Sequence, residues 1–330
     1  MEPNCERTVK IKYSLYFGMV SSLRICLCLL GVCSVIAISA LFVNFQTFRR
    51  AGELKYLPLA KKSVHSVNSY YEFREDNIEG AKTSSSSLSN RLRMKFVARE
   101  LQPKWKAQYR LLVRQFDALM RRLNIKYFLF SGSLIGAYRH HGPVPWDDDF
   151  DVQLSKKDLL KIRKVFDDND PQVKHMKIKM FKSRPWKLSF SYSHWPLVDI
   201  WPYVHIDEYI KDSTFQPWVR RNNSDIFPLV KVPFMGMMLP APRKWRKVLL
   251  DRYGDIDKKC TSHHVSHRTF RTFRVVHTDC AALHGHFPFV TRTLKDGIMS
   301  ETLKLGNRAL SMWRYSVGSK DAPVDRVICD

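Results

Sequence analysis

The chain has 330 residues, of which 45% are hydrophobic and 26% are charged, and its formal net charge is +24 at pH 7. This composition excludes an intrinsically disordered chain, and the length allows one sizeable domain with accessory segments. The positive charge is spread along the sequence and predicts an acidic partner: nucleic acid, an anionic membrane surface, or a phosphate-bearing donor or acidic glycan. We expect no nucleic acid, because the sequence has no recognition helix, zinc-finger spacing or aromatic RNA-binding motif.

Residues 25–43 form the first predicted element. They are uncharged and mostly apolar, and as a helix they would measure about 28 Å, close to the roughly 30 Å of a bilayer's hydrocarbon core. We predict a single transmembrane signal anchor at 25–45 behind a tail at 1–24. A cleaved signal peptide is the alternative, although its apolar run is usually shorter. Residues 46–100 have little periodicity and include a serine-rich run, which is typical of a flexible stem.

The globular part is predicted to begin near residue 101 with an amphipathic helix. Aromatic and aliphatic residues recur there at intervals of three and four, at Trp105, Tyr109, Leu112, Phe116, Leu119 and Leu123. This spacing places them on one face of a helix, so we expect these side chains in the core.

A strand, a tight turn and a second helix are predicted over residues 127–138. An apolar run at 127–130 precedes Ser131, Gly132 and Ser133, and a segment of helical character follows. Glycine lets a phosphate approach the main chain, and the free N–H groups of a first helical turn attract it. The pattern therefore predicts a phosphate contact at Gly132 and Ser133.

Four aspartates then occur within five positions: Asp147, Asp148, Asp149 and Asp151. If a strand begins where the acids end, Asp149 and Asp151 project to the same side, roughly 6.5 to 7 Å apart. Carboxylates so close repel unless a proton or a metal neutralises them, and Mg²⁺ prefers carboxylate oxygen. We therefore predict a site for Mg²⁺ or Mn²⁺; the alternative is a solvated acidic loop.

Beyond the acids, Ser155 and Asp158 resemble a capping box at the start of another helix. Further strands of a mixed sheet are predicted at 177–181, 187–191 and 197–201. Asp199 lies between two apolar residues of the last of these. A buried carboxylate is costly unless it is hydrogen-bonded or bound to metal, so Asp199 belongs either to the metal site or to the exposed face of an edge strand.

The C-terminal part begins with a helix predicted at 242–253 and ended by Gly254. Residues 257–330 form a basic, histidine-rich extension. Cys260 and Cys280 either form a disulfide or, with neighbouring histidines, bind zinc; the sequence does not determine the pairing.

The stretch at 130–154, FSGSLIGAYRHHGPVPWDDDFDVQL, resembles the core signature of the LicD family, which includes fukutin and the fukutin-related protein. Residues 197–203, LVDIWPY, and the segment 231–254 resemble later parts of the same family. The resemblance implies an α+β, nucleotidyltransferase-like mixed sheet flanked by helices, which we place at 101–256. It also implies transfer of a phospho-alcohol from a CDP-linked donor onto a glycan.

Together with the resemblance, the sequence assigns Asp149, Asp151 and Asp199 as metal ligands and catalytic carboxylates. Asp199 either completes the metal shell or accepts the proton of an attacking glycan hydroxyl.

The expected substrate contacts are Gly132, Ser133, Arg139, His140 and Lys187. Arg139 can offer a bidentate fork to phosphate, or instead form a salt bridge with Asp147 or Asp148. Lys187 is either a phosphate contact or a solvated charge on a strand.

The expected function is a membrane-anchored, metal-dependent transfer of phosphoribitol or phosphocholine from a CDP-linked donor to a glycan on a glycoprotein. One alternative is a glycosyltransferase that uses Asp147 and Asp149 as an acid-x-acid metal motif. Another is a non-catalytic scaffold in glycan processing. The sequence does not predict the oligomeric state.

The expected location is the endoplasmic reticulum or Golgi, in a single-pass type II arrangement with a cytosolic N-terminus and a lumenal catalytic domain. Basic residues flank both ends of the predicted anchor and do not decide its orientation. The sequon at Asn222 and the family resemblance favour the lumen, and Asn222 is a predicted glycosylation site.

Overall fold

The structure, a computed structural model, describes residues 69–73, 88–182, 184–190, 195–214, 219–319 and 322–323. All of them belong to one compact unit, 63–330. The predicted tail and anchor, and most of the predicted stem, lie outside the described residues.

The single transmembrane helix in the predicted fold class is unsupported and is corrected here. Within the described part of the chain, no helix is both long and apolar enough to span a bilayer. The α+β part of that prediction agrees with the observed elements. The corrected fold class is therefore α+β with a mixed sheet and no assigned membrane span.

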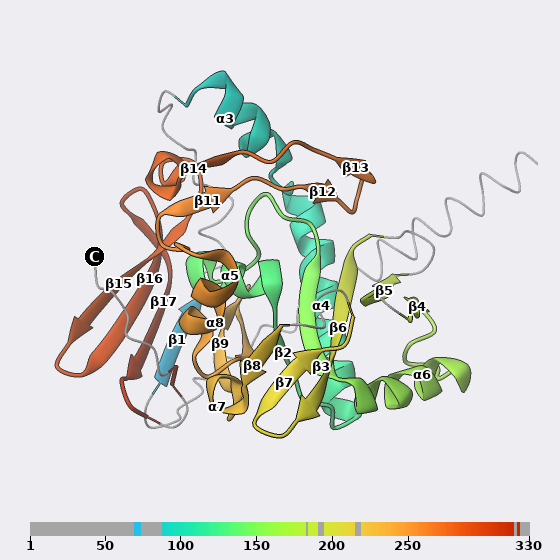
Figure 1. The fold of residues 1–330 in the computed structure, drawn as a ribbon. Helices are drawn as coiled ribbons and strands as arrows, with labels where there is room; N and C mark the ends of the chain where they lie inside the picture. The colour runs from blue at the N-terminus through green and yellow to red at the C-terminus, as the bar shows by residue number, and fades with distance from the viewer. Residues whose placement is uncertain are drawn as a thin grey trace, which may run out of the picture. The chain divides into compact units, whose positions relative to one another are not determined.

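A mixed sheet forms the centre of the unit (Figure 1). Its strand order is β2-β3-β6-β5-β4, and β7 and β8 continue from β6. The bounds are β2 Tyr127–Leu129, β3 Phe150–Ser155, β4 Met176–Lys179, β5 Trp186–Phe190, β6 Leu197–Ile206, β7 Tyr209–Asp212 and β8 Arg220–Asn222. Only the β3 and β6 pair runs parallel among these described strands, which confirms the predicted mixed sheet.

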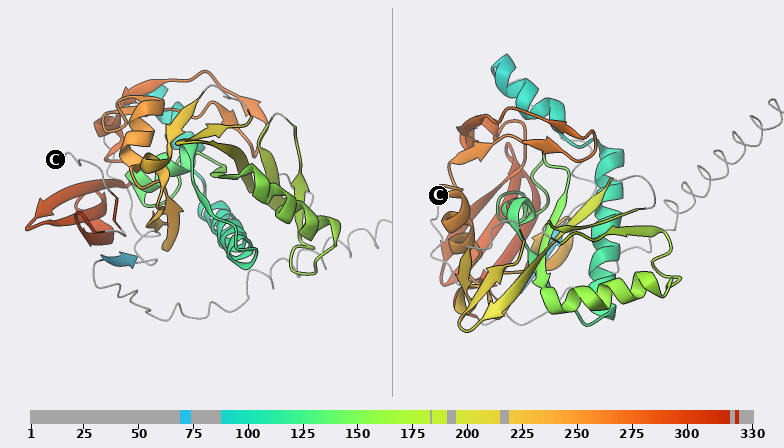
Figure 2. Two further views of the ribbon diagram at one scale, coloured as in Figure 1. Left: turned by 60° about the horizontal axis from the view of Figure 1, so that its bottom comes forward. Right: turned by 45° about the vertical axis from the view of Figure 1, so that its right-hand side comes forward.

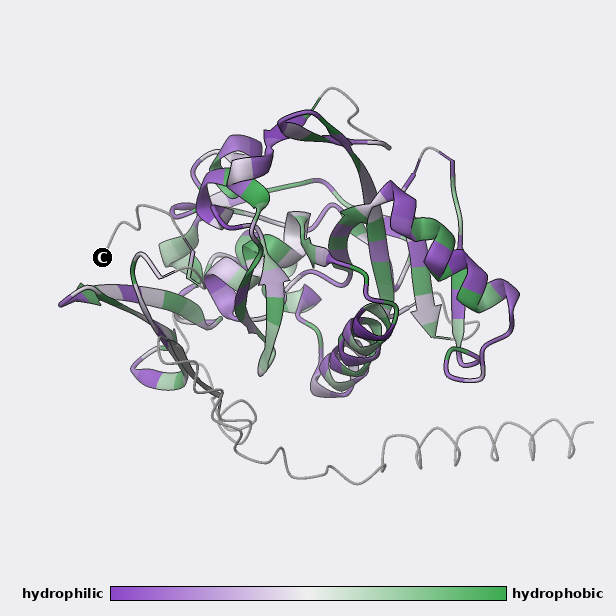
Figure 3. Ribbon diagram, turned by 90° about the horizontal axis from the view of Figure 1, so that it is seen from below, coloured by the Kyte–Doolittle hydropathy of each residue, from purple (hydrophilic) through white to green (hydrophobic). Residues whose placement is uncertain are grey.

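Helix α4 (Pro103–Arg122) packs its apolar face against this sheet. Phe116 lies edge-on to Tyr127 of β2 and Phe150 of β3, with ring centroids 5.1 and 6.0 Å apart. Such offset aromatic pairs add to the free energy gained from burial alone. Figure 2 shows α4 as the long helix beside the sheet, and Figure 3 shows hydrophobic colouring concentrated in the central strands.

The remaining helices are shorter and connect the strands. They are α3 Asn90–Lys95, α5 Ser131–His140, α6 Leu159–Asp167, α7 Asn223–Ile226 and α8 Trp245–Tyr253, with short 3₁₀ turns at Val97–Arg99, Lys156–Asp158 and Cys280–Leu283. Gly254 ends α8 with φ +71°, as predicted. The Ser155 side chain makes no capping hydrogen bond, because a 3₁₀ turn intervenes before α6.

A second, antiparallel sheet is built by the C-terminal segment, in the order β1-β17-β16-β15. Its strands are β1 Ser69–Phe73, β15 Phe289–Lys295, β16 Ile298–Leu305 and β17 Arg308–Ser316. Strand β1 and helix α3 lie within the range predicted to be stem. Two parts of that range therefore have regular structure, because they pair or pack with segments far along the chain.

Three smaller hairpins complete the described strands. They pair β9 Val230–Phe234 with β10 Met237–Ala241, β11 Lys259–Thr261 with β14 His277–Asp279, and β12 Val265–Ser266 with β13 Arg271–Thr272. The last two pairs form one continuous element, here called the 259–279 ribbon. In Figure 1 this ribbon crosses over the loop that leads from α5 into β3.

A buried ionic network joins α5 to the C-terminal sheet. Glu301 is fully buried and accepts hydrogen bonds from Arg292 Nε at 3.0 Å and Tyr315 at 3.4 Å. His141, which ends α5, lies 3.2 Å from its other oxygen. Burial alone would raise the pKa of Glu301, but the Arg292 charge and His141 hold it below its ordinary value.

Glu301→Gln is expected to lower the free energy of unfolding by about 3 to 5 kcal/mol, because it leaves the Arg292 charge buried without its partner. Chemical denaturation measures this loss. The double change Glu301→Leu with Arg292→Met removes both charges and should cost less than Glu301→Gln. A larger loss in the double variant would contradict the account.

Candidate active site

The structure brings the three predicted carboxylates together. Asp151 in β3 and Asp199 in β6 are direct partners in the parallel register, and Asp149 immediately precedes β3. Register partners on adjacent strands point to the same face of a sheet. All three are buried, with 9% of Asp149, 5% of Asp151 and 4% of Asp199 exposed, so the alternatives of a solvated loop and an exposed edge strand do not hold.

The strand-turn-helix motif holds Asp151 in place. The Gly132 N–H donates to Asp151 Oδ2 at 3.0 Å, and Trp201 Nε1 donates to Oδ1 at 2.9 Å. The Asp151 N–H in turn donates to Ser133 Oγ at 2.8 Å. Gly132 and Ser133 both contact Asp151 in the structure, and their predicted contact with phosphate stays a prediction.

Gly132 has a steric role beside the acids. A Cβ at this position would overlap the Asp147 carboxylate and lie 3.4 Å from Asp151 Oδ2. A larger residue would therefore displace the Asp147 carboxylate. The groups that approach the Gly132 main chain closely in the structure are the carboxylates of Asp147 and Asp151.

The site carries negative charge that the described residues compensate only in part. Burial, followed by the charges of Asp199 and Asp147, raises the pKa of Asp151 to about 7. Burial and the neighbouring aspartates, Asp151 first, raise the pKa of Asp149 well above its ordinary value. Groups of this kind bind either protons or a cation.

The donor atoms converge as a divalent cation requires. One oxygen each of Asp149 and Asp199 and one ring nitrogen of His267 lie within 4.8 Å of one another. Asp151 is outside this group, and its oxygens accept hydrogen bonds from Gly132 and Trp201. The residues present therefore fit a metal, with Asp149 and Asp199 as its carboxylate ligands and Asp151 beside it.

Lys187 is placed by the sheet against Asp199. The two residues are opposite each other in the β5 and β6 register, and Lys187 Nζ lies 2.7 and 2.8 Å from the two Asp199 oxygens. Lys187 is thus paired with a carboxylate and is not a solvated strand charge, and its predicted phosphate contact stays a prediction. Lys187 compensates one carboxylate of the cluster.

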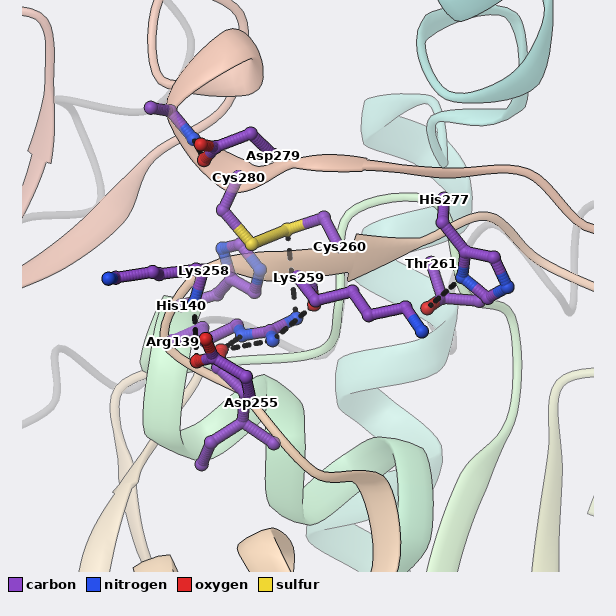
Figure 4. The surroundings of a disulfide bond; sticks show 12 residues. Arg139, His140, Asp255, Lys258, Lys259, Cys260, Thr261, His277, Asp279 and Cys280 are labelled. Atoms are coloured by element: carbon purple, nitrogen blue, oxygen red, sulfur yellow. Dashed lines mark hydrogen bonds between the residues drawn. A yellow bond between two sulfur atoms is a disulfide. The ribbon is translucent and has the colours of Figure 1, made fainter.

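Arg139 has partners that differ from both predictions. Its buried guanidinium donates to the carbonyl oxygens of Ile256 and Lys259 (Figure 4). Burial lowers its pKa to about 10. Arg139 therefore fastens the C-terminal segment to α5 and does not point to the acids.

His140 is also part of the packing around α5. Its Nδ1 lies 2.6 Å from the Pro288 carbonyl oxygen, and its ring packs against Trp146 and Phe289. Burial lowers its pKa to about 3, so the ring is neutral at physiological pH. The predicted substrate contact is replaced by a structural one.

Cys260 and Cys280 form a disulfide, drawn in Figure 4. The bond engages both thiols, which removes the zinc alternative that used them. It closes a loop with a sequence separation of 20. That loop contains the 259–279 ribbon except for its first residue, Lys259.

Removing the disulfide by Cys260→Ser with Cys280→Ser is expected to lower the free energy of unfolding by about 3 kcal/mol, as loop-closure entropy predicts for a loop of this size. Denaturation curves of the parent with and without reductant should differ by a similar amount. The double variant should not respond to reductant, and an equal response from it would contradict this assignment.

The 259–279 ribbon supplies site residues that sequence reasoning missed. Asp148 accepts hydrogen bonds from Ser266 Oγ at 2.8 Å and from the N–H groups of His267 at 3.0 Å and Arg268 at 3.2 Å. His263 Nδ1 lies 3.0 Å from Asp147 Oδ1. The available signal was the cluster of histidines beyond residue 257, which sequence alone does not connect to acids more than 100 positions earlier.

Sequence comparison agrees with this geometry. The family profile described as LicD/FKTN/FKRP, nucleotidyltransferase domain, matches residues 124–244. This range contains all three carboxylates. Residues 124–244 are a LicD-family nucleotidyltransferase domain. The predicted family resemblance is confirmed.

Two relatives with named activities are similar to parts of this chain. The ribitol 5-phosphate transferase FKRP of Mus musculus is 25% identical over 151 residues, which are 43% of this chain and 30% of the relative. The lipopolysaccharide cholinephosphotransferase LicD of Haemophilus influenzae is 51% identical over 51 residues, which are 16% of this chain and 19% of the relative. The chain thus covers less than a third of either relative's length.

Among solved structures, the antibiotic-resistance factor ANT(2'')-Ia matches 46% of this chain and 77% of its own, with a TM-score of 0.33 and 13% identity. This similarity is too low to bear on function.

A basic and aromatic cluster, also missed from the sequence, borders the LicD domain's Gly-Ser turn. The guanidinium groups of Arg221 and Arg252 lie 5.0 and 4.9 Å from the Phe130 ring centroid. The Tyr253 hydroxyl is 2.7 Å from Ser131 Oγ and accepts a hydrogen bond from Arg252 at 2.9 Å. Two guanidinium groups so placed suit a phosphate.

Proposed function

We propose that this chain is a metal-dependent transferase that moves a phospho-alcohol, such as phosphoribitol or phosphocholine, from a CDP-linked donor onto a glycan hydroxyl. The observation that carries the proposal is the convergence of Asp149, Asp151 and Asp199 within a LicD domain. The names of the two relatives, a ribitol 5-phosphate transferase and a cholinephosphotransferase, support the class of group transferred.

Asp149 and Asp199 hold Mg²⁺ or Mn²⁺ in this proposal. A bound cation would orient the pyrophosphate of the donor and neutralise the negative charge on the pyrophosphate oxygens. Lys187 engages both oxygens of Asp199, which favours a ligand role for this carboxylate over acceptance of a proton. Asp151 lies beside this metal group without being one of its ligands, so we assign it the task of accepting the acceptor's proton.

The transfer breaks the bond between the bridging oxygen and the phosphorus that carries the alcohol. CMP leaves with the bridging oxygen, and the glycan hydroxyl oxygen bonds to that phosphorus and loses its proton to a carboxylate. Arg221 and Arg252, beside the Gly-Ser turn, bind the charged phosphates and hold them in line.

A donor screen tests the proposal. Purified protein is incubated with CDP-ribitol, CDP-choline, UDP-sugars and GDP-sugars, each with Mg²⁺ or Mn²⁺, and nucleotide release is measured. Turnover of a CDP-linked alcohol is the expected result. Turnover of a UDP- or GDP-sugar alone would favour the glycosyltransferase alternative, and failure to bind or turn over any donor would favour a non-catalytic scaffold.

We also propose that the protein acts in the lumen of the endoplasmic reticulum or Golgi and carries a glycan on Asn222. The disulfide supports an oxidising compartment. Asn222 is exposed at the end of β8, where an oligosaccharide can be accommodated.

Glycosidase treatment of protein expressed in the secretory pathway should increase its electrophoretic mobility, because it removes the glycan from Asn222. Asn222→Gln should migrate like the treated parent and should not respond to the enzyme. Equal mobility of the untreated parent and this variant would contradict the site.

A further inference from the structure

We propose that His267 is a ligand of the cation held by Asp149 and Asp199, so that the 259–279 ribbon completes the metal site and makes it prefer Mn²⁺ to Mg²⁺. This inference rests on the metal site of the proposed function. It adds a nitrogen ligand from a segment beyond the LicD domain match at 124–244.

The first support is the position of the His267 ring. His267 Nδ1 is buried and makes no hydrogen bond of good geometry with the described residues, although its ring interacts with the Asp148 carboxylate. It lies 3.5 Å from Asp149 Oδ2 and 3.4 Å from Asp148 Oδ1. Metal bonds of about 2.1 Å place neighbouring ligand atoms roughly 3.0 to 3.5 Å apart, so the spacing suits two atoms that share a cation.

The second support is the way in which the ribbon is held. Asp148 accepts the backbone N–H groups of His267 and Arg268, and its carbonyl oxygen accepts a hydrogen bond from Trp195 Nε1. Asp148 is therefore a positioning residue that fixes His267 relative to the neighbouring Asp149. The disulfide closes the same ribbon at its base, which limits the freedom that His267 would lose on binding a metal.

The third support is ligand chemistry. Mg²⁺ takes oxygen ligands almost exclusively and keeps several waters, whereas imidazole nitrogen binds transition metals. A site of two carboxylates and one imidazole therefore gains affinity for Mn²⁺ from its nitrogen and gains little for Mg²⁺. The predicted choice between these two ions is resolved by His267.

The test is pulsed electron paramagnetic resonance of Mn²⁺ bound to the full chain. We expect a ¹⁴N coupling from a directly bound imidazole, and we expect His267→Gln to abolish it. The same variant should raise the Kd for Mn²⁺ by about 10-fold or more and change the Kd for Mg²⁺ by less than about 2-fold. His264→Gln is the matched control, because His264 is exposed on the same ribbon and should retain both the coupling and the affinities.

Two outcomes would overturn the inference while leaving the proposed function intact. One is Mn²⁺ bound through Asp149 without nitrogen coupling. The other is a coupling that survives His267→Gln, which would assign it to another histidine. Because the coupling is read in the parent protein, the test does not depend on the folding of a variant. Absence of any Mn²⁺ or Mg²⁺ binding by the parent would instead overturn both the inference and the metal site.

Discussion

Asp149→Asn and Asp151→Asn are each expected to lower kcat for transfer from a CDP-linked donor by about two to three orders of magnitude, the effect of losing one preorganised electrostatic group. Asp149 offers an oxygen to the metal group, and Asp151 is fixed beside it by Gly132 and Trp201. An amide supplies neither the charge that a cation needs nor a base. Steady-state release of CMP measures the loss.

Asp296→Asn is the matched control for these two changes. Asp296 is exposed in the turn between β15 and β16 with φ +51°, a conformation that asparagine tolerates. This variant should keep parental activity. If Asp149→Asn retained more than about a tenth of the parental kcat while remaining folded, the carboxylate could not have the role assigned to it.

The contribution of Asp151 to the stability of the metal-free protein is expected to fall as the pH rises from 4 to 8, whereas buried His140, with its pKa lowered to about 3, contributes in the opposite direction below about pH 6.5. The folded-state pKa of Asp151 is raised to about 7 from an ordinary 3.8. Between these values the folded protein holds a proton that the unfolded chain has released, so this contribution to the free energy of unfolding falls with rising pH. A difference of about 3 pKa units corresponds to roughly 4 kcal/mol. Asp149 acts in the same direction, because its pKa is also raised.

Denaturant titrations at a series of pH values, in the presence of a chelator, measure this effect. Saturating Mn²⁺ should restore stability at pH 8, because a ligand that binds only the folded state stabilises it by mass action. Asp149→Asn should be more stable than the parent at pH 8 and should respond less to Mn²⁺. The stability difference between Asp149→Asn and the parent should grow from pH 4 to pH 8, and this comparison cancels the opposite contribution of buried His140 and His141. A difference that stays constant over this range would contradict the raised pKa values of the acids.

Local patterns predicted the elements that position the site. The three- and four-residue spacing placed Tyr109, Leu112 and Phe116 in the core, and the acid-apolar alternation gave the correct start of β3. The apolar neighbours of Asp199 left two alternatives open, the metal site and an exposed edge strand, and the structure shows Asp199 buried and in register with Asp151. Each inference used residues close together in sequence, where periodicity is informative.

Contacts between distant segments were beyond such reasoning. Arg139 was expected at a phosphate or an acid, yet its partners are carbonyl oxygens 117 and 120 positions away. Asp148 binds backbone groups 119 and 120 positions away. Strand β1, within the predicted stem, pairs with β17 near the C-terminus. The type of a side chain does not reveal a hydrogen-bond partner far away in the sequence, because several different acceptors could satisfy the same donor.

The nucleotide released from a CDP-linked alcohol tests the central claim most directly, because it identifies the bond that breaks. With a glycan acceptor and Mn²⁺, the account predicts release of CMP, one phosphodiester formed per CMP, and loss of both products in the Asp149→Asn protein. Release of CDP, in which the link between the alcohol and its phosphate breaks instead of the pyrophosphate bridge, would contradict it. So would CMP release that is unchanged by chelator and by Asp149→Asn.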